Sequence, residues 1–353
     1  MNFLSKQWQA LTADWHVLLE KPVSPKKLSF MLIQTSLPSF GFYFMLTLAA
    51  MIATLGLLSN SAATIIGAMI VAPLMGPIIS AAYALVTADH RLLSRSLLTI
   101  ITGTLLVVTI SAVTAYAIGL RVVGAEILAR TNPTLLDLGV AVSAGGAGAF
   151  AMTRKSISNA IAGVAIAVAL VPPLCVVGVG IGLGNDAATG VGLSLSDRGI
   201  VPGSFLLFTT NLVGIIVSAG LVFLLQAYGD VKKAIIGLSA AVLSLIAISY
   251  PLGFSLNRLI IRNEIYHGLS DVKAQRPDLF ADLNGYSWNV RFDADTVYVD
   301  MDLMAPPETF AGDRLSLIAE AIAEGLGIPV KVKFRLIPVN VVEIDVDKTG
   351  KPQ

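Results

Sequence analysis

The sequence predicts an all-α polytopic membrane bundle of about seven spans, followed by a small C-terminal α+β domain. Three observations predict this fold class. Apolar residues make up 55% of the 353 residues, charged residues make up 13%, and the mean hydropathy is +0.78, whereas an average soluble domain is about 45–50% apolar and about 25% charged. The apolar residues gather in runs long enough to cross a bilayer. After residue 257 these runs give way to alternating apolar and polar residues.

Seven apolar runs come near or exceed the roughly 20 helical residues that cross a bilayer core about 30 Å thick. The runs are Leu37–Leu58, Ala62–Val86, Leu97–Leu120, Leu135–Met152, Ile157–Leu183, Val201–Leu225 and Ala234–Leu256. The fourth run is rich in small residues and is the weakest. The second and fifth contain internal prolines, so each is either a straight span, a broken helix or a re-entrant hairpin.

Residues 1–35 form a separate N-terminal segment. Residues 1–34 show no apolar core followed by a small-residue cleavage site, so we expect no secretory signal peptide. The residues that recur at steps of four and three are Leu4, Trp8, Leu11, Trp15 and Leu18. This spacing predicts an amphipathic helix, which either lies in the membrane interface or packs on the protein itself.

Short loops set the orientation, because cytoplasmic loops are enriched in Lys and Arg. With the N-terminus inside, ten basic residues fall on inner segments and three on outer ones. The inner set is Lys6, Lys21, Lys26, Lys27, Arg91, Arg95, Arg154, Lys155, Lys232 and Lys233; the outer set is Arg121, Arg130 and Arg198. We therefore expect a multi-pass protein of the bacterial inner membrane with a cytoplasmic N-terminus. Seven spans would place the C-terminal domain on the non-cytoplasmic side, and one span more or fewer reverses that placement.

An internal repeat appears at a spacing of 99 residues. The segment that begins at Ser59 matches the segment that begins at Ser158, and Pro73 falls on Pro172. The other matched positions are Asn60 with Asn159, Ala63 with Ala162, Ala68 with Ala167, and Thr54 with Thr153. Three spans separate the copies, so the second enters the membrane from the opposite side. This predicts an inverted 3+3 repeat, with halves at about 36–120 and 135–226 and an extra span at 234–256.

The matched prolines supply the candidate site. Proline donates no backbone hydrogen bond and displaces the carbonyl one turn earlier, and in hydrocarbon such a carbonyl needs another partner. The candidate pathway residues are Asn60, Pro73, Pro77, Asn159, Pro172, Pro173 and Asn211. The alternative is a pair of simple kinks repaired by neighbouring helices. We expect Asn60, Asn159, Pro73 and Pro172 to matter more than Asn211, which either binds substrate or bonds a neighbouring helix.

Other polar and small residues of the spans favour structural roles. Asp137 lies close to the start of the fourth run, which indicates a helix-start role at the interface rather than an intramembrane acid. The glycines at 144–149 and at Gly178, Gly180, Gly182 and Gly184 favour close helix packing over a flexible pathway lining.

The tail, residues 258–353, predicts a compact α+β domain. Thr296–Leu303 and Val330–Ile337 alternate like half-buried strands, Glu308–Leu326 has the spacing of an amphipathic helix, and Val341–Val346 is a further strand candidate. We find no nucleophile set, phosphate-binding loop or carboxylate pair in it. A docking, oligomerisation or gating module is expected.

Several classes of function are disfavoured. The apolar body is mildly basic and the tail mildly acidic, so no nucleic-acid partner is expected. The single Cys175 cannot form an intrachain disulfide, and the histidines His16, His90 and His267 are scattered. We therefore expect no cofactor, no metal and no enzyme, with the lipid bilayer as the main partner. Self-association into a homo-oligomer is left open.

Three segments resemble a known family. They are NSAATIIGAMIVAPLMGPI, IAGVAIAVALVPPLCVVGVGIGL and FTTNLVGIIVSAG. Over roughly residues 36–226 the chain resembles the bacterial membrane protein family catalogued as domain of unknown function 389. The resemblance implies a bacterial or archaeal membrane protein and no assigned activity. Some relatives place a soluble domain before the spans, whereas here it follows them, which leaves its role open.

Two functions remain from the residues. The first is a transporter or channel for an ion or small solute, with its pathway between the two proline segments. The second is a non-transporting membrane sensor or scaffold whose C-terminal domain binds a partner. Substrate, coupling ion and direction of transport are not encoded in any recognisable motif.

Overall fold

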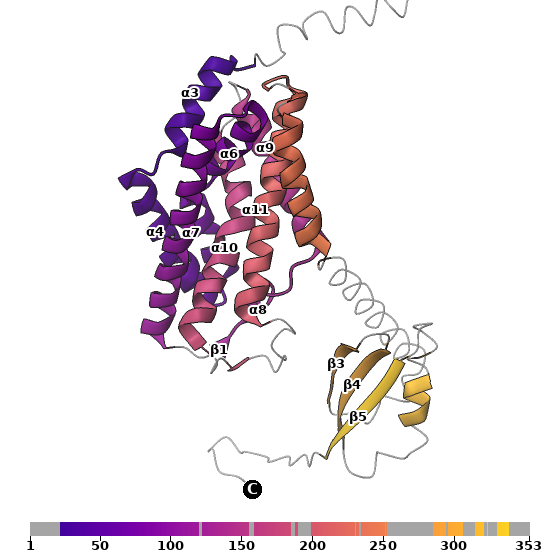
Figure 1. Ribbon diagram of the computed structural model, residues 1–353. Coiled ribbons are helices and arrows are strands. Elements are labelled where there is room, and N and C mark those ends of the chain that lie inside the picture. The colour runs from indigo at the N-terminus through magenta and orange to yellow at the C-terminus, as the bar shows by residue number, and fades with distance from the viewer. Residues whose placement is uncertain are drawn as a thin grey trace, which may run out of the picture. The chain divides into compact units, whose positions relative to one another are not determined.

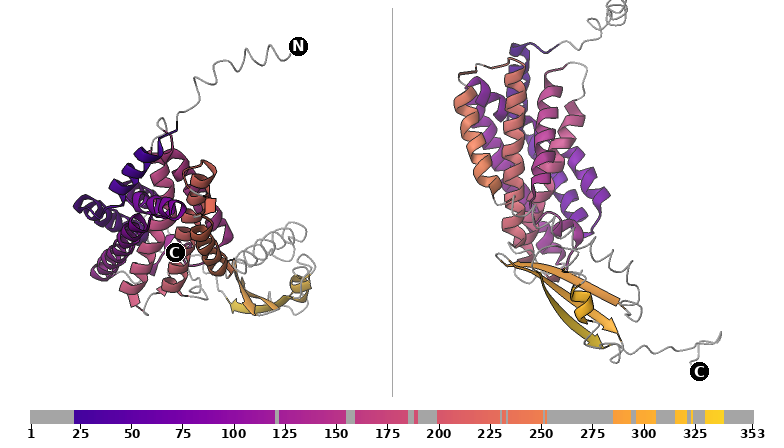
Figure 2. Two further views of the ribbon diagram at one scale, coloured as in Figure 1. Left: turned by 45° about the horizontal axis from the view of Figure 1, so that its top comes forward. Right: turned by 90° about the vertical axis from the view of Figure 1, so that its right-hand side faces the viewer.

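The computed structural model divides the chain into two compact units, Met1–Ser255 and Leu256–Gln353. It describes residues 22–119, 122–154, 159–184, 188–189, 199–229, 231–232, 234–250, 252, 285–293, 296–305, 315–320, 323 and 330–338. The predicted amphipathic helix at residues 4–18 and the strand candidate at 341–346 lie outside these ranges. In the first unit long helices lie side by side along one axis (Figures 1 and 2).

The first unit is built almost entirely of helices. Five of its described helices are long and apolar enough to cross a membrane, or six if one bent pair counts as a single span. In chain order the elements are α3 (Pro25–Ser36), α4 (Phe40–Leu58), α5 (Ala62–Val71), α6 (Met75–Thr87), α7 (His90–Ile118), β1 (Val122–Val123), α8 (Ala125–Leu128), α9 (Leu135–Met152), α10 (Asn159–Leu183), β2 (Ala188–Thr189) and α11 (Ile200–Leu225). A shorter apolar helix, Ala234–Tyr250, follows them.

Most predicted runs coincide closely with these helices, and α7 differs most. It begins at His90, seven residues before the apolar run at Leu97. The carboxylate of Asp89 accepts hydrogen bonds from the backbone N–H groups of Arg91 and Leu92, both at 3.0 Å. This N-cap starts the helix among charged residues, which hydropathy alone does not detect.

The second run is broken in its middle. Helices α5 and α6 meet at a bend of 59° over residues 72–74. Ala72, before Pro73, has extended backbone angles, as a residue that precedes proline prefers. A straight span is therefore wrong for the second run, and the broken helix and the re-entrant hairpin both fit the bend.

The fifth run is not broken. Pro172 and Pro173 lie inside one continuous helix, α10, so the expectation of two matched breaks is wrong. α10 is also the most enclosed span, since 78% of its most apolar 18-residue window is buried, against 28% for α7. Side chains of the surrounding helices can donate hydrogen bonds to carbonyls that the prolines leave without a partner. This keeps α10 continuous across its prolines.

Helices α5 and α10, which carry the two predicted repeat segments, run in opposite directions. Helix α5 starts beside Gly124, because Asn60 contacts that glycine, and the strand β1 next to Gly124 pairs with β2 just after α10. Helix α5 therefore begins at the end of the bundle where α10 finishes. At the other end, Val23 donates a backbone hydrogen bond to Thr153, between α9 and α10.

Glycines bring two of the central helices into close contact. A methyl group on Gly178 of α10 would lie 2.5 Å from the Ser111 Cβ and 2.5 Å from the Val108 carbonyl oxygen of α7. One turn later, a methyl on Gly182 would lie 2.5 Å from the Ala112 carbonyl oxygen. Gly178 and Gly182 thus form a small-residue seam, as the packing interpretation predicts.

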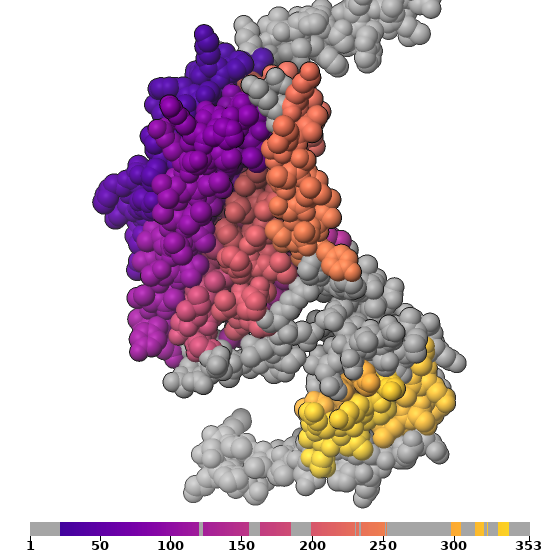
Figure 3. All heavy atoms as spheres, viewed as in Figure 1, coloured from indigo at the N-terminus to yellow at the C-terminus, as the bar shows by residue number. Residues whose placement is uncertain are grey.

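The outer surface of the first unit is apolar. Helix Ala234–Tyr250 lies on the face shown in Figure 3 (orange), and its outward residues include Ile236, Leu243 and Ile246, each at least 63% exposed. On its inner side a methyl on Gly237 would meet the Leu85 carbonyl oxygen at 2.8 Å, so the helix packs closely on α6. Large apolar side chains exposed around a helical bundle indicate a lipid-facing surface.

The second unit contains a three-stranded sheet in the order β3 (Gly285–Asp293), β4 (Thr296–Ala305) and β5 (Val330–Pro338). β3 and β4 are antiparallel, whereas β4 and β5 are parallel and are separated in sequence by helical residues 315–320. The predicted strands correspond to β4 and β5. β3 was missed, although Tyr286, Trp288, Val290 and Phe292 alternate with polar residues.

The glycine seam yields a stability prediction. Gly178→Ala should lower the free energy of unfolding by about 1–3 kcal/mol, because its methyl overpacks the α7–α10 contact. The measurement is thermal unfolding of the purified chain in detergent. Gly139→Ala in α9 is the matched control, since nothing lies within 4 Å of the added methyl. Equal effects of the two substitutions would contradict the seam.

Candidate functional site

The α5–α6 break is held by helix α3 from one side. A methyl on Gly76 would lie 2.7 Å from the Thr35 carbonyl oxygen, so the start of α6 touches the last turn of α3. The buried Ser80 hydroxyl donates to the Leu32 carbonyl oxygen at 2.9 Å and is 2.7 Å from the Gly76 carbonyl oxygen. Pro77 is buried at the third residue of α6, where a helix has no need of its N–H. The broken span is therefore a packed feature of the bundle interior.

The hydrogen bond lost at Pro173 of α10 is replaced by a side chain from α11. Pro173 has no N–H for the carbonyl of Ala169, four residues earlier. The Asn211 Nδ2 donates to that carbonyl oxygen at 2.9 Å. Asn211 is only 3% exposed and lies near the middle of α11. The expected hydrogen bond between Asn211 and a neighbouring helix is thus present, and it explains why α10 continues through its prolines.

The same amide leaves one oxygen atom unpaired. The Asn211 Oδ1 is buried and has no hydrogen-bond partner among the described residues. Turning the amide by 180° would set two acceptors against each other at Ala169, so the contact fixes the nitrogen on that side. The side chain therefore holds a buried acceptor away from Ala169.

Two contacts relate the segment that contains the break to α11 and α10. Helices α6 and α11 run in the same direction, and the rings of Tyr83 and Phe223 meet edge to face at 5.3 Å. Twelve residues earlier on each segment lie Val71 and Asn211. Helix α10 runs the other way and brings Gly163 beside Met75, 3.3 Å from its Sδ to a methyl built on the glycine. Six residues from this contact lie Met69, toward the start of α5, and Ala169, toward the end of α10.

A second polar cluster lies among α4, α7 and α10. The Thr54 Oγ1 is 2.8 Å from the Ser111 Oγ and 2.7 Å from the Ala50 carbonyl oxygen, to which the Cys175 Sγ donates at 3.9 Å. All three side chains are buried. Each has a hydrogen-bond partner within the protein, so this cluster serves to join the three helices.

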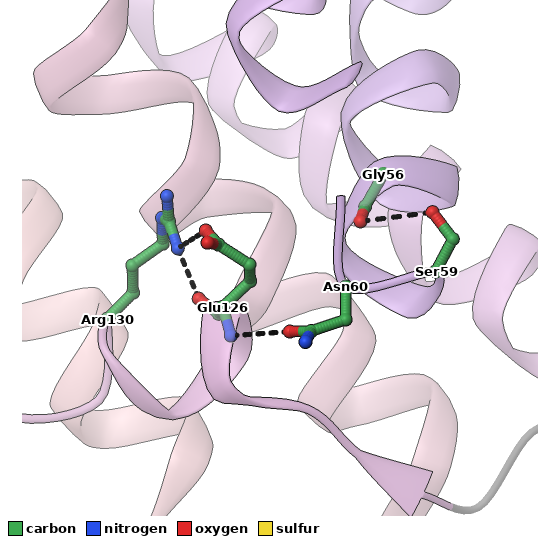
Figure 4. A network of polar contacts seen from close by, with 5 residues as sticks. All are labelled: Gly56, Ser59, Asn60, Glu126 and Arg130. Atoms are coloured by element: carbon green, nitrogen blue, oxygen red, sulfur yellow. Dashed lines mark hydrogen bonds and ion pairs between the residues drawn. The ribbon is translucent and has the colours of Figure 1, made fainter. Parts of the chain in front are cut away.

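Asn60 lies at the end of the bundle rather than in its interior (Figure 4). It is exposed, with a φ of 53°, in the turn that joins α4 to α5. Its Oδ1 accepts a hydrogen bond from the Glu126 backbone N–H at 2.9 Å, while Glu126 pairs with Arg130 at 2.8 Å. The amide fixes a turn in this structure, and the ranking of Asn60 above Asn211 for activity stays a prediction.

The remaining candidate residues lie in different parts of the bundle. Asn159 begins α10 at the opposite end from Asn60, and its side chain lies outside the described part. Asp137 forms a capping box with Thr134, whose N–H and hydroxyl approach its carboxylate at 2.9 and 2.7 Å. The expected helix-start role of Asp137 is confirmed. Pro77, Pro172, Pro173 and Asn211 are buried in the bundle, and Pro73 is half-buried at the break.

The loops of one bundle end are tied together by polar contacts. The Tyr228 hydroxyl donates to the Val23 carbonyl oxygen at 2.6 Å, and the Thr153 hydroxyl donates to the Gln226 Oε1 at 2.9 Å. Burial raises the pKa of Tyr228, and the positive charge of Arg154 opposes that shift. These contacts fix which helix ends share this face.

Charge is distributed very unevenly along the bundle axis. Among the described residues of the helical unit, every buried polar side chain is a serine, threonine or asparagine, so the interior carries no buried charge there. The described basic residues at the end where α3 begins are Lys26, Lys27, Arg91, Arg95, Arg154 and Lys232. At the opposite end the described basic residue is Arg130, which is paired with Glu126.

The similarity to known proteins falls within this helical unit. Residues 69–217 match the family model described as domain of unknown function (DUF389). An uncharacterized protein of the archaeon Methanocaldococcus jannaschii is 33% identical over 188 residues, which cover 52% of this chain and 53% of the relative. This chain thus spans about half the length of the curated relative that it matches. The matched residues 69–217 lie within the helical unit and include Pro73, the α10 prolines and Asn211, so this part of the chain is similar to the DUF389 family.

Proposed function

We propose that this chain is a membrane transporter or channel for an ion or small solute. The observation that carries the proposal is the 59° break of an apolar span in the interior of a bundle that also holds a buried, unpaired amide oxygen. Interrupted helices at mid-membrane are typical of the substrate and ion sites of secondary transporters. The pathway runs beside the break and includes Pro73, Pro77, Pro172, Pro173 and Asn211.

An inverted 3+3 repeat is part of this proposal. The helix order α4, α5–α6, α7 corresponds to α9, α10, α11 at the spacing of 99 residues. The opposite directions of α5 and α10 support it, as does a reciprocal contact pattern in which α10 packs on α7 and α6 packs on α11. The two halves differ locally, because only the first is broken at its prolines.

The orientation follows from the concentration of basic residues at one end. We propose that this end faces the cytoplasm, because short cytoplasmic loops carry the excess of Lys and Arg. Helix Ala234–Tyr250 would then be a seventh span that continues toward Leu256 and places the C-terminal domain on the other side. The membrane is the inner membrane in a bacterial host.

A scaffold is the second candidate, and one observation favours it. The Asn211–Ala169 hydrogen bond repairs a proline within the protein, as a purely structural kink requires. In this case the C-terminal sheet would bind the partner through its polar face, where Asp300, Asp302, Lys333 and Arg335 line a hollow of about 330 Å³.

Reconstitution tests the transport proposal. Purified chain in liposomes should show protein-dependent flux of at least one member of a panel of inorganic ions, amino acids and organic acids. Pro73→Ala restores the backbone N–H that a straight helix needs, so a carbonyl proposed to line the pathway would be taken up in a helical hydrogen bond. The flux should fall roughly five- to hundredfold, because each polar ligand of the pathway is worth about 1–3 kcal/mol. Gly139→Ala is the control for expression and insertion. Protein-dependent flux of no panel member would favour the scaffold.

Cysteine labelling tests the orientation. Cys175 is buried and gives a low background, so single cysteines are introduced at the exposed residues Lys27, Asn132 and Lys331. In intact spheroplasts an impermeant maleimide should label Asn132→Cys and Lys331→Cys, and should label Lys27→Cys only after lysis. Labelling of Lys331→Cys together with Lys27→Cys would mean an even number of spans.

A further inference from the structure

We infer that the Asn211 amide oxygen, together with backbone carbonyls at the α5–α6 break, binds a partly dehydrated monovalent alkali cation such as Na⁺ or K⁺. The inference rests on the proposed transport function, because it names the class of ion that the pathway carries or couples to. Binding itself is measurable without transport.

The first argument is the unpaired acceptor. Asn211 is 3% exposed, and its Oδ1 has no partner among the described residues. A buried acceptor left without a donor costs about 1–3 kcal/mol. The amide cannot be turned to point this oxygen at Ala169, because two acceptor oxygens would then face each other. A ligand that interacts with an oxygen lone pair would offset the cost.

The second argument is the excess of acceptors at the same depth. The last four carbonyls of a helix have no donors within that helix, and α5 ends at Val71 in the interior. Pro73 and Pro77 remove two of the N–H groups that follow, and Pro172 removes the helical donor of the Val168 carbonyl. The contacts of Tyr83 with Phe223 and of Gly163 with Met75 hold α6 beside α11 and the start of α6 beside α10, and a residue count along these helices brings the acceptors to about the level of Asn211.

The third argument is the absence of charge. Every buried polar side chain in the described bundle is neutral. Protein sites for Ca²⁺ and Mg²⁺ use carboxylates, and an anion needs donors rather than acceptors. Neutral carbonyl and amide oxygens suit alkali cations, as in carbonyl-lined filters and in unwound transporter helices. A single positive charge therefore fits the groups present.

Cation binding is tested on the purified full-length chain in detergent. Thermal unfolding is measured in NaCl, KCl, LiCl and choline chloride at equal ionic strength, and ²²Na⁺ binding is measured by equilibrium dialysis. An alkali cation should raise the unfolding midpoint relative to choline, because a ligand that binds only the folded state stabilises it. Equal midpoints in all four salts, with no ²²Na⁺ bound, would overturn the inference.

The decisive variant separates binding from repair. Asn211→Ala alone leaves the Ala169 carbonyl without its donor and is expected to unfold more easily. Asn211→Ala combined with Pro173→Ala restores a backbone N–H for that carbonyl, and Pro173→Ala alone is the reference. The double variant should match the reference in choline and bind Na⁺ at least about tenfold more weakly, a change of about 1.4 kcal/mol.

Thr209→Val is the matched control on the same helix. Its hydroxyl bonds only the Phe205 carbonyl oxygen of its own turn, at 2.8 Å, so the response to cations should be unchanged. Full cation binding by the double variant would show that Asn211 only repairs the helix and would overturn the site. Flux measured in liposomes with the same protein separates the two proposals. Flux without cation binding would contradict the cation site, and cation binding without flux would contradict the transport function.

Discussion

The structure depends on one constraint: a backbone carbonyl in an apolar bundle needs a donor, and the prolines take donors away. Two solutions stand in the same molecule. At Pro173 the Asn211 amide replaces the missing N–H, and α10 stays straight enough to remain one helix. At Pro73 the helix ends, bends by 59° and restarts as α6. Ser80 and the end of α3 fill the space around that restart.

The rest of the bundle is arranged around these two solutions. Gly178 and Gly182 let α7 approach the backbone of α10, so the helix with the repaired prolines is enclosed on several sides. Because α10 is enclosed, water cannot reach its carbonyls, and the donor must come from a side chain of a neighbouring helix. At the bundle ends, where water is present, the turns use ordinary caps such as Asp89, Thr134 and Asn60.

Much of this fold could be predicted from the sequence, because hydropathy and small-residue patterns report directly on lipid contact and helix packing. The spans α4, α9, α10 and α11 follow from apolar runs, and Asp137 follows from its place before a run. The unequal fate of the two proline pairs could not be predicted, since it depends on Asn211, which is distant in sequence from Ala169. The hydrogen-bond partners of Asn60 and Asn211 could not be predicted for the same reason: an amide's partner is set by tertiary contacts.

The Asn211–Ala169 hydrogen bond also constrains how the bundle can move. Any sliding or rotation of α10 against α11 would break this bond and strand a carbonyl in an apolar interior, at a cost of about 1–3 kcal/mol. These two helices are therefore expected to travel as one rigid body. The α5–α6 joint is held on its α6 side by the Ser80–Leu32 hydrogen bond, and the extended Ala72 provides a natural hinge for α5. The two proline-containing spans would thus have unequal mechanical roles, with α5–α6 deforming and α10 together with α11 serving as a fixed support.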